Sequence, residues 1–437
     1  MNTFGLRSYY RPTQFSRISL EYHTTNEFRR GGNKFDLQPH ETDITEQTKH
    51  IINSGGLTYD VFFNEYRHKL SVYGSAQHID RNSYYGAEEN PNAYGKTKDL
   101  TAVGGAMYVG NMDDCLFSPA TFTGGLEYNY NSLHDVMMGY NRDLRQNVRV
   151  ISGFAQNEWK MTYFTLLAGF RLDKHNLIDN VIFSPRVNLL WKPSDKLQGR
   201  LTWSTGFRAP QAYDEDLHVA AVGGEAMIIR LADGLKPERS NSFSGSVDWS
   251  FNIGHFQSDL LVEGFYTSLN DVFYLTGIGK DTDTGAEIQE RRNGYGARVY
   301  GANIDYKIAH GREAQLQLGF TLQRSRYTEA VSWSKDADVA PIKRMPRTPD
   351  YYGYFTFTSA PLKNFDFSLS GIYTGPMVVP HFAGYIEKDR LEHTPNFMEL
   401  NLKLNYTFVL NDHLKLQVNG GVQNMFNAFQ KDLDKGA

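Results

Sequence analysis

A strictly alternating stretch near the end of the chain constrains the fold more than any other feature. From Met398 to Phe408 every even-numbered residue is apolar and every odd-numbered residue is polar. The alternation returns from Leu414 to Gln423 after a short turn. A period of two places the apolar side chains on one face of a β-strand, whereas a helix needs a period of 3.6. The two segments are therefore predicted to form a hairpin of long antiparallel strands.

The length of these strands suits a lipid bilayer. Each has about ten residues, which is what a tilted strand needs to cross a membrane. The chain contains no apolar run of about 18 residues, so the sequence predicts no transmembrane helix. Its mean hydropathy is negative although Tyr (27) and Phe (28) are frequent. An aromatic-rich but polar chain is typical of membrane barrels, because half of their strand residues face a wet interior.

The same pattern recurs along the chain and indicates about 18 strands. They are predicted at 4–10, 18–22, 57–63, 69–79, 100–110, 122–130, 154–160, 162–173, 187–191, 197–204, 243–250, 255–269, 300–308, 314–322, 351–358, 365–373, 398–408 and 414–423. The polar segments 26–53, 80–98, 131–149 and 206–237 are predicted to be loops.

The connections between these strands alternate between short and long. Short turns are predicted near residues 12, 65, 161, 194, 253, 311, 362 and 411, and long connections lie between them. Outer-membrane barrels have this asymmetry, with short periplasmic turns and long outer loops. A soluble β-sandwich, the alternative, requires Greek-key crossovers and shorter strands. The predicted fold is therefore an all-β, antiparallel, up-and-down transmembrane β-barrel.

Strand length and aromatic side chains indicate that the apolar face of each strand points outward to lipid and the polar face inward. The rings near predicted strand ends suit the girdles that flank the apolar belt of a barrel. They are Trp159, Trp191, Trp203, Trp249, Tyr351 and Tyr352. The alternative is that these rings fill a soluble core.

Little else in the sequence indicates chemistry. A net charge of −4 without a basic stripe argues against a nucleic-acid partner. The lone Cys115 is interpreted as a buried or incidental thiol. Asp281–Gly285 faintly resembles a calcium loop, but the further acids are missing and a plain turn is favoured. No catalytic residue, resident metal or cofactor is predicted.

One outer-loop segment offers candidate ligand-binding residues. The longest predicted loop carries acids and a histidine close together, which supply oxygen and nitrogen donors for a cation or another ligand. These residues are Tyr213, Asp214, Asp216 and His218. The alternative interpretation is an ordinary solvated loop.

Four further motifs, in order, resemble the barrel region of TonB-dependent outer-membrane receptors. Trp203–Pro210 followed by Leu235–Ser240 is similar to the family's GFRAP and LKPE-S pair. The supporting segments are Phe154–Trp159 before Leu167–Asp173, Arg347–Tyr351, and Val422–Asn427. The motifs themselves are interpreted as structural, because Gly and Pro end one strand and the second segment leads into the next.

The resemblance implies a 22-stranded barrel with a globular plug and a box that the energising TonB protein grips. The sequence 1–437 shows no signal peptide, plug, TonB box or closing strand. The expectation is therefore one partial barrel domain with about 18 of 22 strands. In the bacterial outer membrane it is expected to contact lipid, to bind a small-molecule ligand at its outer loops, to reach TonB through the missing N-terminal region, and to be monomeric when complete.

The implied function is uptake of a scarce solute, such as an iron chelate or cobalamin, through a plugged barrel. Two alternatives stay open at this point. One is a passive porin-like channel, and the other is an outer-membrane barrel enzyme, for which no convincing Ser/His or Asp/His set is found in the sequence.

Overall fold

The computed structural model describes residues 1–210, 227–283, 285, 287–334, 336, 338–383 and 386–430. Long strands dominate the described part of the chain. They are β1 (Asn2–Tyr10), β2 (Ser16–Gly32), β3 (Ile44–Phe63), β4 (His68–Ala87), β5 (Tyr94–Cys115), β6 (Ser118–Met137), β7 (Arg142–Lys160), β8 (Phe164–His175), β9 (Ile182–Ser194), β10 (Leu197–Arg208), β12 (Glu238–Ile253), β13 (Phe256–Asn270), β16 (Ala297–His310), β17 (Ala314–Val331), β19 (Tyr351–Leu362), β20 (Phe365–Thr374), β23 (Phe397–Asn411) and β24 (Leu414–Val422).

Shorter elements lie in the connections. They are η1 (Pro39–Glu41), η2 (Met138–Tyr140), β11 (Met227–Leu231), β14 (Phe273–Lys280), β15 (Glu287–Asn293), β18 (Ile342–Arg344), β21 (Val378–His381) and β22 (Arg390–His393). In the described part of the chain, no helix is long and apolar enough to cross a membrane.

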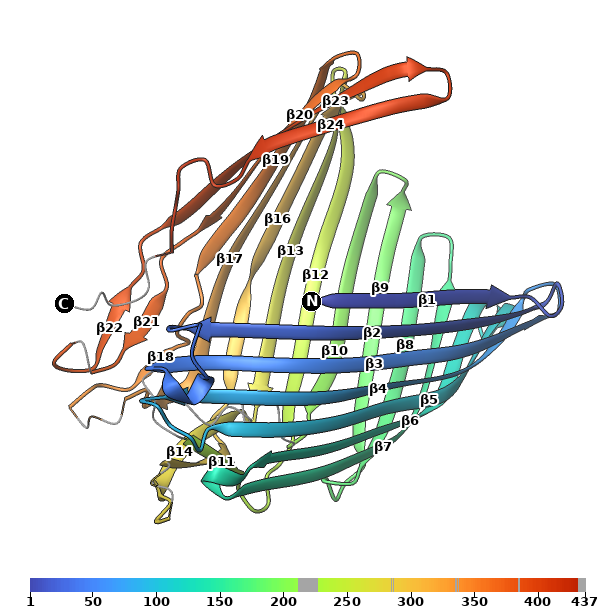
Figure 1. The fold of residues 1–437 in the computed structure, drawn as a ribbon. Coiled ribbons are helices and arrows are strands. Elements are labelled where there is room, and N and C mark those ends of the chain that lie inside the picture. Colours follow the sequence, from blue (N-terminus) through green and yellow to red (C-terminus); the bar gives the residue numbers. More distant parts are fainter. Residues whose placement is uncertain are drawn as a thin grey trace.

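Each long strand pairs antiparallel with the long strand that follows it (Figure 1). The result is one 19-stranded sheet that includes the short β18, and the sheet curves around a hollow (Figure 1). Among the described residues, no ladder joins β1 to β24. The predicted all-β, up-and-down meander is confirmed, and ring closure is not observed.

One end of the sheet has only tight turns, of two to five residues. Positive φ angles mark several of them, at Glu65, Leu116, Gly254, Gly311 and Asn364. The turn at Leu116 was not among the predicted short turns, because the segment before it shows only weak alternation. With it included, every connection at this end is short, whereas the connections at the other end include long ones as well as the four residues 138–141.

Three predicted loops are wrong in extent. β2 and β3 leave only residues 33–43 between them, β4 and β5 leave 88–93, and β6 and β7 leave 138–141. Most of the polar segments 26–53, 80–98 and 131–149 is therefore strand. Above the bilayer both faces of a strand meet water, so the alternation that reveals a strand in the sequence is lost there.

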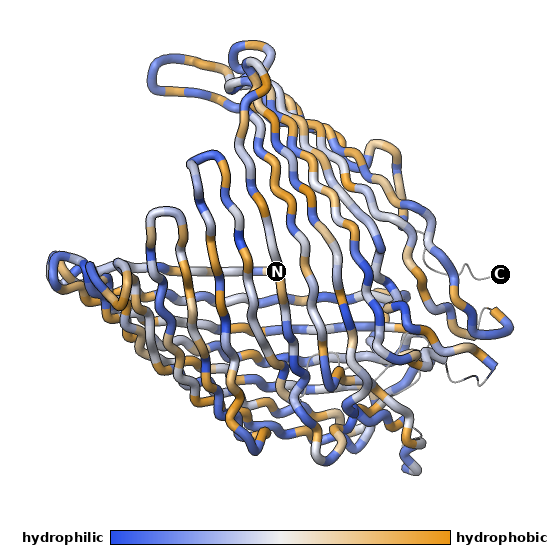
Figure 2. Tube along the Cα trace, turned by 180° about the vertical axis from the view of Figure 1, so that it is seen from behind, coloured by the Kyte–Doolittle hydropathy of each residue, from blue (hydrophilic) through white to orange (hydrophobic). Residues whose placement is uncertain are grey.

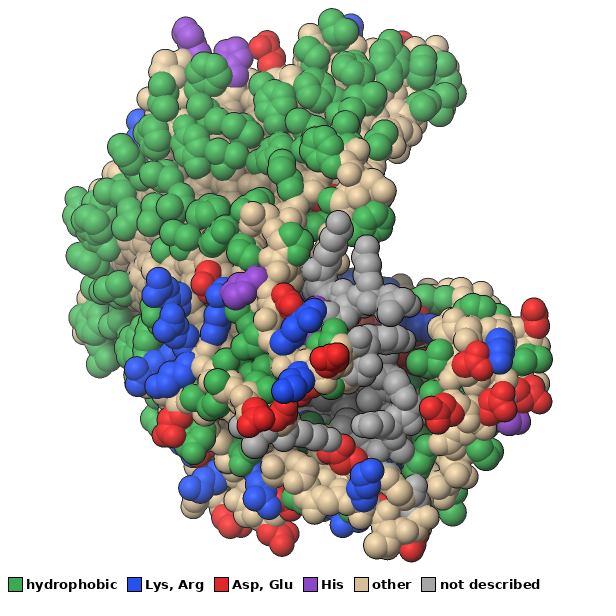
Figure 3. Space-filling view, turned by 90° about the vertical axis from the view of Figure 1, so that its left-hand side faces the viewer, with side chains coloured by type: hydrophobic (Ala, Val, Ile, Leu, Met, Phe, Trp, Pro, Cys, Tyr) green, Lys and Arg blue, Asp and Glu red, His purple; other side chains and the backbone are tan. Residues whose placement is uncertain are grey.

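The two faces of the sheet differ as predicted. Leu201, Phe243, Val247 and Leu322 belong to one face and are between 50% and 63% exposed, so no second sheet covers them. Figure 2 shows the hydropathy alternating along many of the strands, and Figure 3 shows apolar side chains covering the outer surface in that view. The apolar rows therefore face outward, where a bilayer would cover them.

Aromatic rings border this outer face. Cross-strand pairing puts five of the six predicted girdle rings on this outer face. It places Tyr352 on the inner face, opposite Thr321 of β17, whose partner on β16 is Asn303. Tyr351, directly before it, lies outward opposite Leu322. Adjacent strand residues point to opposite faces, so only one of two neighbouring tyrosines can belong to the girdle.

The inner face carries polar networks in place of an apolar core. The Asp60 carboxylate, 1% exposed, accepts hydrogen bonds from Arg17 (2.9 Å) and Ser71 (2.7 Å) and lies 3.0 Å from the Lys69 ammonium. Arg171 pairs similarly with Glu127 at 2.8 Å. Buried charges are tolerated only when they are paired. These side-chain networks therefore satisfy the charged groups of the polar inner wall.

Candidate ligand-binding site at the outer loops

The four residues predicted to bind a ligand lie outside the described part of the chain. Tyr213, Asp214, Asp216 and His218 all fall within residues 211–226. Their role stays a prediction, and the candidate site is built from the neighbouring loops.

The base of the candidate site is fixed by the motif residues of β10 and β12. Arg208 and Glu238 are direct partners in the ladder, and their side chains form an ion pair of 3.5 Å. Glu238 also accepts a hydrogen bond from the Phe273 backbone N–H at 2.5 Å. The guanidinium groups of Arg208 and Arg291 both lie within 6 Å of the centre of the Phe273 ring. These contacts tie the start of β14 to the barrel wall.

A second connection holds the same loop. The Asn293 side-chain amide donates to the backbone carbonyls of Lys236 (2.9 Å) and Asp271 (2.8 Å), and its oxygen accepts from the Lys236 N–H at 2.8 Å. β14, β15 and β11 form a small three-stranded sheet on this base. The sheet is built by long connections and rises from the outer end of the barrel (Figure 1).

A pocket of about 1060 Å³ lies between this small sheet and two further outer loops. Its walls come from β14 and β15, from the end of β17 with the loop after it, and from the loop between β21 and β22. Aromatic side chains are the main shared feature of its lining. They are Phe273, Tyr274, Tyr295, Tyr327, Trp333 and Phe382.

Two of the loops are cross-linked at the pocket. The Ser334 hydroxyl donates to Asp389 at 2.5 Å, and the Ala383 N–H donates to the same carboxylate at 2.7 Å. The Trp333 and Phe382 rings lie 6.1 Å apart. The hydrogen bond from Ser334 lowers the pKa of Asp389 below its ordinary value of 3.8, so the carboxylate is ionised at neutral pH. The two loops are thereby held in a defined arrangement.

The chemistry of the pocket is that of a binding site. Tyr274, Tyr295 and Phe382 are 41%, 53% and 58% exposed, and such accessible rings suit stacking on a flat, partly apolar molecule. The polar lining consists mainly of Gln289, Asp336, Glu387, Lys388 and Asp389. In the described residues no cluster of His, Cys, Asp or Glu could hold a metal ion.

The described residues of the predicted turn, Asp281 to Asp283 and Gly285, are joined by hydrogen bonds. The Gly285 N–H donates to the Asp281 carbonyl at 2.9 Å, and Gly285 has a φ of +69°. The Asp281 carboxylate accepts the Asp283 N–H at 3.2 Å. This acid thus shapes the turn, as favoured from the sequence.

Comparison with known proteins now decides the class. The family described as "TonB dependent receptor-like, beta-barrel" matches residues 2–425. The chain belongs to this receptor family. Membership places it in the outer membrane and among receptors and transporters, so the barrel-enzyme alternative is set aside.

Individual relatives agree with the family. The chain is 31% identical over 205 residues to the iron-regulated outer membrane virulence protein of Vibrio cholerae serotype O1, covering 45% of this chain and 30% of that protein. The fold is similar to the siderophore receptor PirA of Acinetobacter baumannii, with a TM-score of 0.71, 14% identity, and coverage of 97% of this chain and 66% of that one.

A third relative was solved with a ligand. It is a point mutant of the ferric enterobactin receptor PfeA of Pseudomonas aeruginosa in complex with enterobactin, with a TM-score of 0.69, 15% identity, and coverage of 96% of this chain and 64% of that one. The receptor chain described here thus spans slightly less than two thirds of the length of these solved receptors. At such identities the likeness establishes the fold alone.

Sequence reasoning missed the aromatic pocket of this receptor. The available signal was the presence of large rings, such as Trp333 and Phe382, inside long connections and away from any alternating segment. Rings in that position cannot belong to a lipid-facing girdle. Which side chains of these neighbouring loops meet, however, depends on the loop conformations, and the strand pattern does not encode them.

Proposed function

We propose that this chain forms the barrel portion of a TonB-dependent receptor that captures an iron chelate at its outer loops. The observation that carries the proposal is the aromatic pocket between β14 and the loops of Trp333 and Phe382, in a chain of this family. Rings supply stacking surfaces for ring-bearing chelators. The iron-regulated relative and the siderophore receptors support the same ligand class.

Transport in the complete protein would need more than this pocket. We propose that a plug fills the hollow of the sheet, and that TonB drives its rearrangement through an N-terminal region outside residues 1–437. The paired charges of the inner wall, such as Arg171 with Glu127, whose side chains are 35% and 21% exposed, offer the polar surface that such a plug would contact. The iron is cargo in this scheme, and no covalent chemistry is required.

The test uses the complete receptor, with ferric enterobactin as the probe. Binding is followed by quenching of tryptophan fluorescence, and uptake of the radiolabelled chelate is measured in cells with and without TonB. We expect binding in both strains and uptake only with TonB. Removing one stacking ring by Trp333→Ala should weaken binding about fivefold, since a ring contact contributes about 1 kcal/mol.

The matched control is Trp249→Phe. Trp249 lies on the outward face of β12 towards the tight-turn end, far along the strand from the pocket. The Trp249→Phe variant should leave the binding of ferric enterobactin unchanged. Uptake that persists without TonB would favour a passive channel, and binding of cobalamin in place of the ferric chelate would change the ligand class while keeping the receptor.

A further inference from the structure

A row of arginines crosses the outer face of the sheet near its loop end. Arg298 of β16 is the direct cross-strand partner of Arg326 of β17, which in turn pairs with Arg344 of β18. Arg324 lies two residues from Arg326 on the same face. Figure 3 shows basic side chains gathered along the edge of the apolar belt on the side of the long loops.

This row holds more positive charge than the described residues neutralise. Arg344 forms a 3.1 Å ion pair with Asp350. Arg298, Arg324 and Arg326 are exposed, and none of them has an ion pair with a residue that the structure describes. Like charges directly opposite each other on neighbouring strands are destabilising, so an anionic partner would relieve this arrangement.

The row lies at the height of lipid headgroups. The next row towards the tight turns, one residue pair away on the same face, is Trp203, Phe243, Tyr266, Tyr300 and Arg324, joined by direct cross-strand pairing. Its four rings form a girdle of the kind that marks the membrane interface. Arg298 and Arg326, immediately beyond this girdle, therefore meet the headgroups of the outer leaflet.

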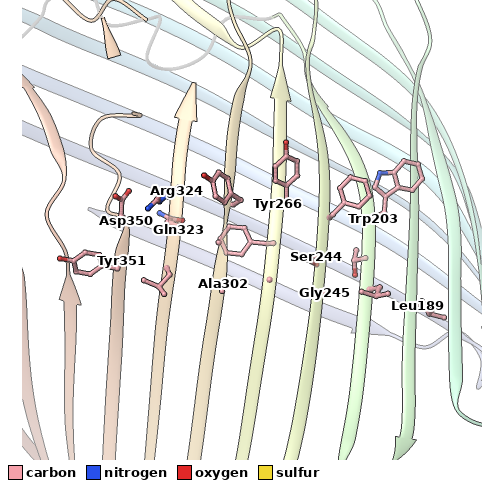
Figure 4. A pocket seen from close by; sticks show the side chains of 18 of the residues that line it. Leu189, Trp203, Ser244, Gly245, Tyr266, Ala302, Gln323, Arg324, Asp350 and Tyr351 are labelled. Carbon is pink, nitrogen blue, oxygen red and sulfur yellow. The ribbon is translucent and has the colours of Figure 1, made fainter. Parts of the chain in front are cut away.

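Below the girdle the outer face is hollow. Gly245, Gly264 and Ala302 are successive cross-strand partners, flanked by Leu201 on one side and Leu322 on the other. They form the floor of a cavity of about 1210 Å³ whose rim includes Arg324 (Figure 4). A Cβ added to Gly264 would meet nothing within 4 Å, so this floor is open to the surroundings. A groove of this kind suits an acyl chain.

We propose that these two features form one binding site for a phosphate-bearing lipid of the outer leaflet. Arg298, Arg324 and Arg326 would bind the phosphates, because guanidinium groups match phosphate geometry in paired hydrogen bonds. An acyl chain of the same lipid would lie in the groove over Gly264. The site faces away from the hollow of the barrel, and it is independent of which solute the receptor transports.

The experiment measures lipid binding to the complete receptor by native mass spectrometry from detergent. The probes are a bisphosphorylated glycolipid, its dephosphorylated form, and inorganic pyrophosphate. The double variant R298Q/R326Q should weaken binding of the phosphorylated lipid about 30-fold, from the typical effect of two basic side chains at a charged membrane surface. Gly264→Leu should fill the groove and weaken binding of the lipid, while leaving any binding of pyrophosphate unchanged.

The matched control is R145Q/R149Q. Both arginines lie on β7, on the outward face and towards the loop end, and their removal changes the net charge equally. This variant should bind the phosphorylated lipid like the unmodified receptor. Equal binding of the dephosphorylated lipid, an equal loss in the control variant, or pyrophosphate competing as strongly as the lipid would each overturn the proposal.

Discussion

Val247 offers the sharpest test of which face of the sheet meets lipid. It lies midway along the outward row of β12 between Phe243 and Ile253, and its side chain is 51% exposed. Its cross-strand partner Val262 is exposed as well. An arginine at this height would lie near the bilayer midplane, where it costs about 2–4 kcal/mol. Val247→Arg should therefore lower the free energy of unfolding of the complete receptor by about 3 kcal/mol.

The matched control is Ser246→Arg, one residue earlier. Ser246 faces inward, between Arg200 on one strand and Glu263 on the other. The new arginine gains attraction from Glu263 and repulsion from Arg200, each worth less than about 1 kcal/mol, so the net change should be small.

The assay is urea unfolding of the reconstituted receptor in lipid vesicles, followed by tryptophan fluorescence. The unfolding free energies of the two variants are compared with that of the unmodified receptor under identical conditions. A larger loss for Ser246→Arg than for Val247→Arg, or equal losses, would show that the apolar rows do not face lipid.

Three further outcomes follow from the described contacts. Asp135→Asn should lower the free energy of unfolding by about 3 kcal/mol, because the 2%-exposed Asp135 carboxylate lies between the buried Arg81 and Arg142. The control Asp143→Asn, at an exposed ion pair, should leave the urea midpoint unchanged. Because the pKa of Asp389 is lowered, the contribution of this carboxylate to loop cross-linking is present above pH 3.8 and is lost as the pH falls through the lowered value. The fluorescence emission of Trp333 should therefore stay constant from pH 7 to 5. Asp389→Asn should give at pH 7 the emission that the unmodified receptor shows at low pH. A cysteine at Leu116, in a variant without the native thiol, should react with an impermeant maleimide only after the outer membrane is opened; labelling in intact cells would reverse the assigned orientation.

The membrane-crossing part of the fold was readable from the sequence because the bilayer imposes a rule on it. Within the bilayer one face must be apolar, so the segments 243–250 and 398–408 alternate without exception. Above the bilayer this rule ends, and the outer halves of β2 to β7 are strands where the sequence predicts loops. The hydrogen-bonded ladder continues there, stabilised by side chains such as the buried Asp135, which no periodic pattern reveals.

The candidate site was less predictable for a different reason. Its base depends on two motif residues, Arg208 and Glu238, that are partners in the β10–β12 ladder. Its walls come from loops separated by more than a hundred residues. Ser334 and Asp389 lie on successive outer connections, one after β17 and the other after β20, and their contact joins these neighbouring loops. Strand order makes these loops neighbours at the outer end of the sheet, whereas the side chains that meet depend on loop conformations, which no strand pattern encodes.

The GFRAP and LKPE motifs explain how such a chain can vary its loops without losing its barrel. Arg208 and Glu238 are the last pair in the β10–β12 ladder, and the long connection that starts after Pro210 begins immediately beyond them. Their ion pair and the contacts of Phe273 fix both ends of that connection and the root of β14. A loop whose ends are fixed tolerates changes in length at a cost that grows only slowly. The motif residues therefore hold the ends of this connection at the base of the candidate site, and Glu238→Gln should loosen β14 while leaving the rest of the meander paired.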